Sequence, residues 1–325
     1  MDLEKTLSAS TGRVTVIGEA LIDLVADPSG AGFTAHPGGS PYNVAVGLAR
    51  LGVPTSLMAR LGDNAFGRLL RSHAEAEGVD LGPAARAAEP TTLAVVTLDA
   101  RAHATYDFYL TGTADWQWTG SELAAFPPDT AVLHFGSVAA WMPPGDAHVV
   151  DLARRVKAAG SALVSYDPNV RPGLLGDPAS ARARIERCVA QAHLVKTSAE
   201  DLAWLYPDTP ADAVAADWLA RSPTVVVVTD GPEGASLHRS GAAPVRRPGI
   251  TVAVADTVGA GDSFTSAMLA SLLGRGVDDP GRLVGCPEGV LIDAVDDAIR
   301  ASAWTCGRAG ADPPTAADLA SSTLD

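Results

Sequence analysis

The segment from Asp256 to Phe264 combines residue types that can hold a phosphate group and remove a proton. It reads Asp-Thr-Val-Gly-Ala-Gly-Asp-Ser-Phe and leads into a helical pattern over 262–273. Backbone N–H groups in such a turn converge on one point, and small side chains let an anion approach them. Asp262 would lie in the first helical turn, where the helix dipole favours a carboxylate that can take a proton from a hydroxyl. The same pattern also fits an ordinary helix N-cap.

A second segment, His36 to Ala45, has features of a site for a hydroxylated ligand. Gly38 and Gly39 allow a ligand to approach the backbone closely. Asn43 follows them and offers both a hydrogen-bond donor and an acceptor. The alternative is a turn that caps the helix predicted over 41–51.

A third segment runs from Gly18 to Asp23, after a short β-branched strand predicted over 14–17. Ligands of α/β proteins gather at the carboxyl ends of strands, so Asp23 could accept hydrogen bonds from a polyol. The alternative is a solvated turn residue. The segment lacks the Gly-x-Gly-x-x-Gly fingerprint, and none of the chain's three lysines follows a glycine, so neither a dinucleotide-binding motif nor a Walker A loop is present.

These segments must be positioned by elements that the hydrophobic pattern predicts. Strands are predicted at 14–17, 93–98, 105–110, 131–135, 162–166, 194–195 and 224–228, and helices at 41–51, 65–77, 145–159, 179–191, 199–206, 262–273 and 289–300. Uniformly apolar strands that alternate with helices indicate a parallel sheet covered on both faces. The hairpin material at 91–115 breaks this rhythm, so we predict one domain over 1–325 with a small β lid. Residues 274–289 are predicted to form a surface loop.

Composition and charge exclude several classes of protein. The 325 residues are 47% hydrophobic and 19% charged, which is typical of a globular chain rather than a disordered one. No apolar run is long enough to span a membrane. The formal net charge of −14 would repel nucleic acid, although aimed donors can still bind a small anion. The three scattered cysteines and the polar N-terminus predict a cytoplasmic protein without a signal peptide.

The motifs together resemble one family. GGSPYNVAVGLARLG, ARLGDNAFGRLL and DTVGAGDSFTSAML are similar to segments of the PfkB family of carbohydrate kinases, and HFGS, DPNVR and LVKTSAEDL resemble fructokinases within it. The resemblance implies a ribokinase-like, three-layer α/β sandwich: a mostly parallel central sheet with helices on both faces, and a lid of strands near 31–37 and 91–115. It also implies a homodimer joined through the lid.

The resemblance assigns roles by position. The implied catalytic group is Asp262, with an anion hole formed by Gly259, Ala260 and Gly261. The implied sugar-binding positions are Asp23, Gly38, Gly39 and Asn43, to which we add Tyr109 and Arg171 as candidates. The implied nucleotide contacts are Lys196, Thr229, Gly231 and Gly234. Magnesium would be supported indirectly by Glu200 or Asp201, and a monovalent cation such as K⁺ would lie near Asp256. For Arg171 the alternative is a pair with an acidic neighbour, and for Tyr109 it is packing within the lid.

The resulting expectation is an ATP-dependent kinase that phosphorylates a hydroxyl of a neutral sugar, with fructose favoured. Leu110 stands where related lid strands often carry arginine. Without that arginine an acidic sugar would lose a charge-assisted hydrogen bond to its carboxylate, so an acidic substrate is disfavoured. The alternatives are a 2-keto-3-deoxygluconate kinase, a ribokinase or a nucleoside kinase. A sensor that binds sugar or nucleotide without catalysis is the alternative from another class.

Overall fold

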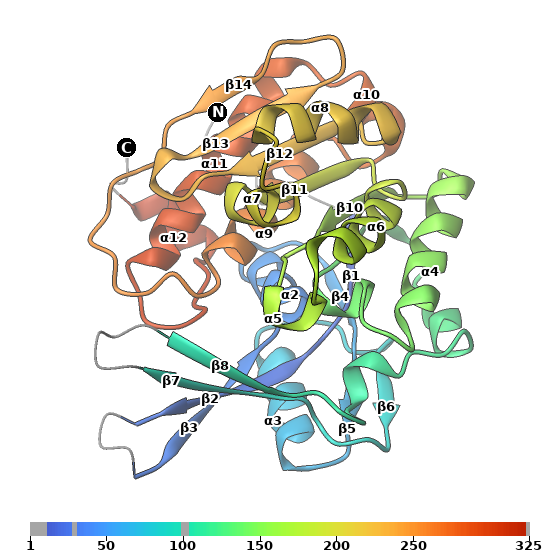
Figure 1. The fold of residues 1–325 in the computed structure, drawn as a ribbon, viewed down its shortest axis with the longest axis vertical. Coiled ribbons are helices and arrows are strands. Elements are labelled where there is room, and N and C mark those ends of the chain that lie inside the picture. The colour runs from blue at the N-terminus through green and yellow to red at the C-terminus, as the bar shows by residue number, and fades with distance from the viewer. Residues whose placement is uncertain (1–11, 28–30, 99–103, 323–325) are drawn as a thin grey trace.

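The main sheet of the protein carries eight strands. The computed structural model describes residues 12–27, 31–98 and 104–322 (Figure 1). The strand order is β14-β13-β12-β11-β10-β9-β1-β4. The strands are β1 (Arg13–Ile17), β4 (Thr55–Met58), β9 (Thr130–Gly136), β10 (Leu163–Asp167), β11 (Leu194–Ser198), β12 (Val225–Thr229), β13 (Ala235–Arg239) and β14 (Val245–Arg247). From β4 to β12 every neighbouring pair is parallel, whereas β13 is antiparallel to both of its neighbours.

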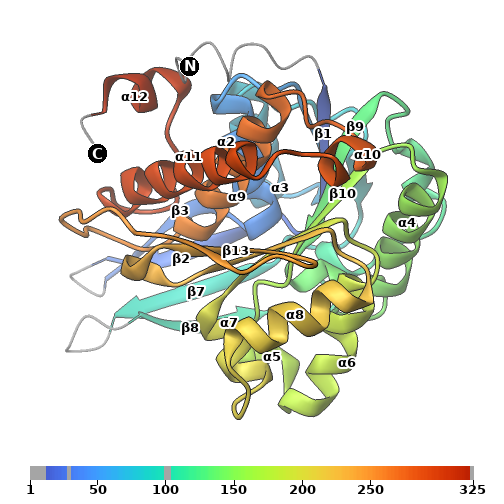
Figure 2. The same ribbon diagram turned by 90° about the horizontal axis from the view of Figure 1, so that it is seen from above.

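Helices cover both faces of this sheet, as Figure 2 shows. One face carries α2 (Ser40–Arg50), α9 (Ala260–Gly274) and α11 (Glu288–Cys306), and the other carries α4 (Asp146–Ala159), α6 (Pro178–Val189), α7 (Ala199–Leu205) and α8 (Ala211–Arg221). Side chains alternate between faces along a strand, so Val225 and Val227 enter one core and Val226 and Val228 enter the other. The predicted three-layer α/β sandwich is confirmed.

A second sheet of four strands projects from the main body (Figure 1). Its order is β3-β2-β7-β8, formed by β3 (Phe33–Gly38), β2 (Leu21–Ala26), β7 (Leu93–Leu98) and β8 (Ala104–Tyr109). Strand β2 was not expected, and the interpretation of Asp23 as a turn residue is wrong because Asp23 lies inside that strand. Residues 110–115 leave the sheet, and η1 (Ala114–Trp116) begins there.

Shorter elements connect these layers. They are β5 (Arg60–Gly62), α3 (Ala65–Ala76), β6 (Ala85–Ala87), η2 (Glu122–Ala125), η3 (Val138–Ala140), α5 (Pro172–Leu175), η4 (Gly231–Glu233), α10 (Pro280–Val284) and α12 (Ala316–Ser321). The loop predicted over 274–289 therefore contains a helix. Asp279 caps α10 by accepting a hydrogen bond from the Arg282 amide, and Leu283 is buried beneath it. No helix in the described part of the chain is long and apolar enough to cross a membrane.

Candidate active site

The glycine turn before α9 has the backbone geometry that the sequence predicts. Gly259 is the N-cap and adopts a left-handed conformation with φ 76°. A Cβ atom at this position would stand 2.7 Å from the Cβ of Ala311, so a side chain is excluded by both conformation and space. Ala260 and Gly261 begin the helix, and Asp262 follows in its first turn. The N–H group of Ala260 donates to the carbonyl of Thr257 at 3.2 Å, so the N–H groups of Gly261 and Asp262 are the ones in this first turn that can face an anion.

The carboxylate of Asp262 bonds to another helix rather than capping its own. Its Oδ1 accepts a hydrogen bond of 2.6 Å from Ser40 Oγ, and its Oδ2 accepts one of 2.8 Å from Asn43 Nδ2. Both donors lie in the first turn of α2, which begins after Gly39 with φ 103°. The alternative of an ordinary N-cap is therefore wrong for Asp262.

The environment of Asp262 opposes its ionisation in part and supports it in part. Burial raises the pKa of the carboxyl group, and the hydrogen bonds from Ser40 and Asn43 act in the opposite direction. The positive charge of Lys196 also lowers it, whereas Asp167 raises it. A half-buried carboxyl group whose pKa is raised is suited to general-base catalysis.

Asp23 lies close enough to Asp262 for the two charges to interact. Burial raises the pKa of Asp23 to about 6; the positive charge of Arg171 lowers it and the charge of Asp262 raises it further. Gly38, on the neighbouring strand, packs against this carboxylate, because a Cβ atom there would stand 2.2 Å from Asp23 Oδ2. The structure therefore brings three of the predicted sugar-binding residues close together: Asp23 of β2, Gly38 of β3 and Asn43 of α2.

A buried ion pair lies directly beside the glycine turn. Lys196 Nζ is 2.9 Å from Asp167 Oδ2, and both side chains are almost fully buried; Asp167 ends β10, and Lys196 lies in the middle of β11. The same Nζ atom would lie 3.0 Å from a Cβ atom on Gly261. The sequence motifs predicted Lys196 as a site residue, but they did not predict Asp167 or Ser40. The available signal for Asp167 was its place as the last residue of a buried strand.

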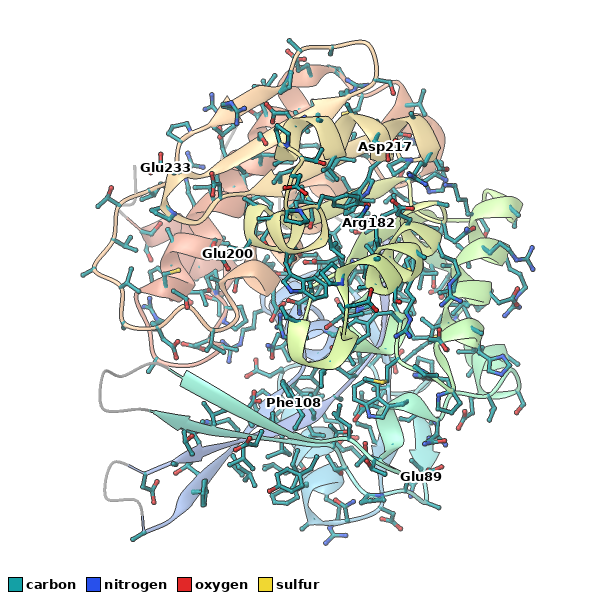
Figure 3. The ribbon with its side chains drawn as sticks, in the orientation of Figure 1. Glu89, Phe108, Arg182, Glu200, Asp217 and Glu233 are labelled. Atoms are coloured by element: carbon teal, nitrogen blue, oxygen red, sulfur yellow. The ribbon has the colours of Figure 1, made fainter. Side chains whose placement is uncertain are left out.

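The two candidate magnesium carboxylates differ in their surroundings. Glu200 is exposed on α7 (Figure 3). Asp201 is half-buried; burial raises its pKa to about 6, the charge of Asp167 adds to this, and Lys196 lowers it. Of the two, only Asp201 interacts with the buried ion pair. Among the described residues no group of three or more His, Cys, Asp or Glu side chains is placed to hold a metal ion.

The predicted nucleotide loop joins β12 to β13. Thr229 ends β12, and its Oγ1 donates a hydrogen bond of 3.3 Å to the carbonyl of Thr197. Gly231 and Gly234 follow with φ 48° and 98° around η4, where Figure 3 labels Glu233. The loop therefore lies at the same carboxyl-terminal edge of the sheet as Asp167 and Lys196, which is where ligands of open α/β sheets bind.

Asp256 holds the loop before the glycine turn. Its two carboxylate oxygens accept hydrogen bonds from the amides of Val258, at 3.1 Å, and Gly310, at 2.9 Å. The carbonyl of Cys306 accepts from the amides of Ala255 and Asp256. These bonds tie the 256–258 turn to the segment that follows α11.

Two further candidates are exposed. Tyr109, at the end of β8, is 61% exposed. Arg171 is exposed at the start of α5, where its Nη1 donates to the carbonyl of Val170 at 3.1 Å. Arg171 nevertheless acts electrostatically on Asp23 and Asp201, so its positive charge lies near the site.

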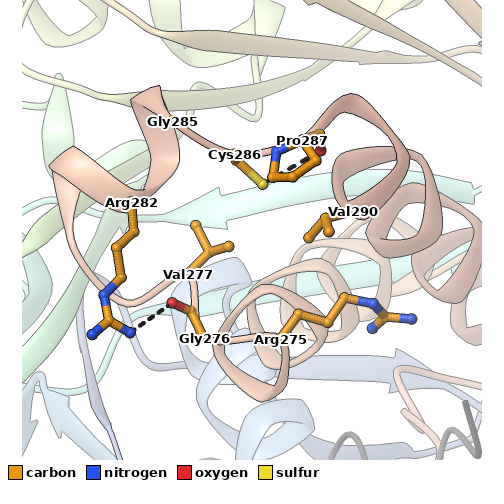
Figure 4. Close-up of a pocket in the computed structure, with 8 residues that line it drawn as sticks. All are labelled: Arg275, Gly276, Val277, Arg282, Gly285, Cys286, Pro287 and Val290. Carbon is orange, nitrogen blue, oxygen red and sulfur yellow. Dashed lines mark hydrogen bonds between the residues drawn. The ribbon is translucent and has the colours of Figure 1, made fainter.

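A pocket of about 260 Å³ lies elsewhere, at the far end of α9 (Figure 4). Its lining includes Arg275, Val277, Arg282 and Cys286. The charge of Arg275 is neutralised by Asp297 at 3.0 Å, and that of Arg282 by neighbouring aspartates. The pocket therefore has little free positive charge for a phosphate, and it is remote from Asp262 because α9 is 15 residues long.

Known proteins share this fold. A crystal structure of fructokinase with bound ATP from Xylella fastidiosa superposes with a TM-score of 0.86 at 28% identity, over 94% of this chain and 96% of that chain. A fructokinase double mutant from Vibrio cholerae O395, in a fructose-, ADP- and potassium-bound form, gives 0.81 at 27% identity, over 96% of each chain. These neighbours place the fold in the ribokinase-like class of kinases.

The sequence comparisons define the family. The family model described as pfkB family carbohydrate kinase matches residues 11–317. A fructokinase from Rhizobium leguminosarum bv. trifolii is 40% identical over 259 residues, which cover 78% of this chain and 78% of that protein. The chain therefore belongs to the pfkB family of carbohydrate kinases, enzymes that transfer a phosphoryl group to a sugar hydroxyl.

Proposed function

We propose that the protein is an ATP-dependent fructokinase in which Asp262 is the general base. The observation that carries the proposal is the position of a half-buried carboxylate beside a glycine turn at a helix N-terminus, with Asp23 and Asn43 close by. The relatives named fructokinase favour fructose over the other sugars. The absence of arginine at Leu110 favours a neutral substrate over an acidic one.

The residues of the chain divide the work of an in-line transfer. Asp23 accepts hydrogen bonds from the sugar, and Asn43 can both donate and accept them. These bonds orient the sugar so that one hydroxyl faces Asp262. Asp262 takes the proton of that hydroxyl as its oxygen attacks phosphorus. The turn of Gly259, Ala260 and Gly261, through the free amide of Gly261 and the N-terminus of α9, stabilises the charge on the transferred group. Lys196 lies beside Gly261 and adds a fixed positive charge there.

The implied nucleotide and ions fit this edge of the sheet. Thr229, Gly231 and Gly234 would hold the nucleotide. Gly231 is open where a Cβ atom would stand and lets a ligand approach the backbone, whereas Gly234 packs against the backbone of residues 247–249 and shapes the loop. When bound, ATP supplies the phosphoryl group and Mg²⁺ neutralises its phosphate charges. Asp201 is the better supported of the two magnesium candidates, since Glu200 points to solvent. Asp256 orders the turn near which K⁺ would lie.

The four-stranded sheet would act as a lid over the sugar. It carries Asp23 on β2, and its closure would exclude water from the transfer. The single-domain organisation and a homodimer through this sheet stay predictions, as does a cytoplasmic location. The exposed side chains of Phe33 and Tyr109 on its two outer strands support an interface there.

The test is a panel of sugars with ATP, read by mass detection of the phosphorylated product, for the wild type and Asp262→Asn. We expect fructose to give the highest kcat/KM. The variant is nearly isosteric but cannot accept the proton, so its kcat should fall by about 10²–10⁴-fold while ATP binding is retained. A sugar that binds by calorimetry without formation of ADP would instead support a sensor. Unchanged turnover in the variant would overturn the mechanism.

A further inference from the structure

Ser40 makes the shortest contact to the proposed base. It is the first residue of α2, directly after Gly39, and only 8% of it is exposed. Its Oγ donates to Asp262 Oδ1 at 2.6 Å, across 222 positions of the sequence. This length is typical of a charge-assisted bond between a hydroxyl and an ionised carboxylate.

The same face of α2 holds the second oxygen of the base. Asn43 lies three residues after Ser40, and residues with this spacing share a helix face. Asn43 Nδ2 donates to Asp262 Oδ2 at 2.8 Å. Each carboxylate oxygen accepts up to two hydrogen bonds, so each keeps one lone pair for a substrate hydroxyl. The two donors therefore fix the plane of the carboxylate without blocking it.

The charges around Asp262 explain why such donors are needed. Burial and Asp167, on β10, favour the protonated acid, and Asp23, on β2, adds a further negative charge nearby. Lys196, on β11, acts against them, together with Ser40 and Asn43 on α2. A buried carboxyl group without sufficient donors keeps its proton at neutral pH, and it is then unable to act as a base.

We propose that the Ser40 hydroxyl is a positioning group that orients the carboxylate of Asp262 and keeps it ionised within its buried site. This inference rests on the proposed function, because it assigns a partner to the base of that reaction. Ser40 acts through Asp262 and needs no contact of its own with the reacting atoms. The expected signature is a change in the pH dependence of the reaction rather than a uniform loss of rate.

The experiment compares pH–rate profiles of the wild type, Ser40→Ala and Ser40→Thr with fructose and ATP. Ser266→Ala is the matched control, since Ser266 is a buried serine of α9 at the contact with α2 whose Oγ bonds to the carbonyl of Ser263. Without the Ser40 donor the carboxylate is less stabilised, so the acid limb of kcat should move to higher pH. We expect kcat of Ser40→Ala to be about tenfold lower on the acid side and within about threefold of the wild type on the alkaline plateau.

The remaining variants separate positioning from structure. Ser40→Thr keeps a hydroxyl and should restore the position of the acid limb, and Ser266→Ala should leave it unmoved. An acid limb that stays in place in Ser40→Ala, or an equal loss of kcat at every pH, would overturn the inference. The latter result would indicate a merely structural contact.

A second measurement works without turnover. The Asp262 carboxyl can be followed by NMR in protein labelled with ¹³C-aspartate, with its signal assigned from Asp262→Asn. Its titration should move to higher pH in Ser40→Ala and stay in place in Ser266→Ala. If the wild type phosphorylates no sugar, the proposed function fails, and this titration still decides whether Ser40 controls the carboxylate. Identical titrations in the wild type and Ser40→Ala would refute the inference.

Discussion

Two regions of the molecule bury carboxyl groups in opposite ways. At the floor of the proposed active site, Asp262 accepts bonds from Ser40 and Asn43, and Asp167 is paired with Lys196 at 2.9 Å. The second region is the junction where the chain passes between the main sheet and the four-stranded sheet. There Glu19 and Asp115 are buried, and neither forms an ion pair within the described residues.

Burial raises the pKa of both carboxyl groups at this junction, and the side chains of Ser137, for Glu19, and of Thr92, for Asp115, act against it together with backbone amides. Glu19 Oε2 accepts from the amide of Ala139 at 3.1 Å, and Asp115 Oδ1 accepts from the amide of Ala20 at 2.8 Å. Asp115 Oδ2 is buried and makes no hydrogen bond within the described residues. Burial raises the pKa of Asp115 to about 7, and the charge of Glu19 contributes to this.

The difference shows how one residue type serves two purposes. At the proposed active site, Ser40, Asn43 and Lys196 act against the effect of burial on the pKa of Asp262, which favours the form that can accept a proton. At the junction, the charge of Glu19 adds to the effect of burial on the pKa of Asp115, so Asp115 can remain a neutral acid there. Three changes test this contrast, beginning with the one expected to have the largest effect.

Lys196→Met would leave the negative charge of Asp167 buried without its partner. Loss of one member of a buried ion pair typically costs about 3–5 kcal/mol, so the free energy of unfolding in urea should fall by that amount. Removing both charges in Lys196→Met with Asp167→Asn should recover much of the loss, because no unpaired charge remains. A loss below about 1 kcal/mol in the single variant would show that the pair is well solvated.

The sequence alone predicted much of the layered fold. Strands such as Val225–Thr229 are apolar on both faces, and that pattern is specific for a buried parallel strand. Strand β2 was missed because only Gly18, Glu19 and Ala20 separate it from β1. The chain passes from one sheet to the other there without the residues typical of a turn. No local sequence pattern indicates which sheet a strand will join.

Only part of the site could be predicted, because local patterns do not show contacts between distant segments. Asp262 and Asn43 stand in recognisable motifs, and the structure joins them by a hydrogen bond. Ser40 and Asp167 were not selected because their importance lies in contacts with Asp262 and Lys196, 222 and 29 positions away. Spacing within a segment carries no information about such pairs, which are set by how α2 and α9, or β10 and β11, pack together.

Asp23 is a carboxyl group of the proposed active site whose pKa is raised to about 6. Burial and the charge of Asp262 raise this pKa, and the charge of Arg171 lowers it. In Asp23→Asn one charged acceptor for the sugar is lost, so the KM for fructose should rise by about ten- to a hundredfold, in line with about 1.5–3 kcal/mol for such a bond. The KM for ATP should change little. In the wild type, sugar affinity should also weaken as pH falls below about 6, and the variant should lack this dependence.

The control for Asp23 comes from the same sheet. Asp107 is an exposed aspartate on β8, and Asp107→Asn removes the same charge from the protein surface. It should leave the KM for fructose and its pH dependence unchanged. Equal effects of the two substitutions would mean that net charge, rather than contact with the sugar, explains the result.

Asp115→Asn tests the junction, and we expect the smallest effect there. An unfolded aspartate has a pKa near 3.9, whereas the folded group titrates at about 7. Between about pH 4 and 7 the folded state keeps a proton that the unfolded state has lost, so wild-type stability should fall as pH rises through this window. The ceiling is about 1.4 kcal/mol per pH unit, and coupling to Glu19 spreads the titration. From pH 5 to 8 the variant should therefore gain about 1 kcal/mol on the wild type in urea unfolding. Parallel pH dependences would show that folding does not raise the pKa of Asp115.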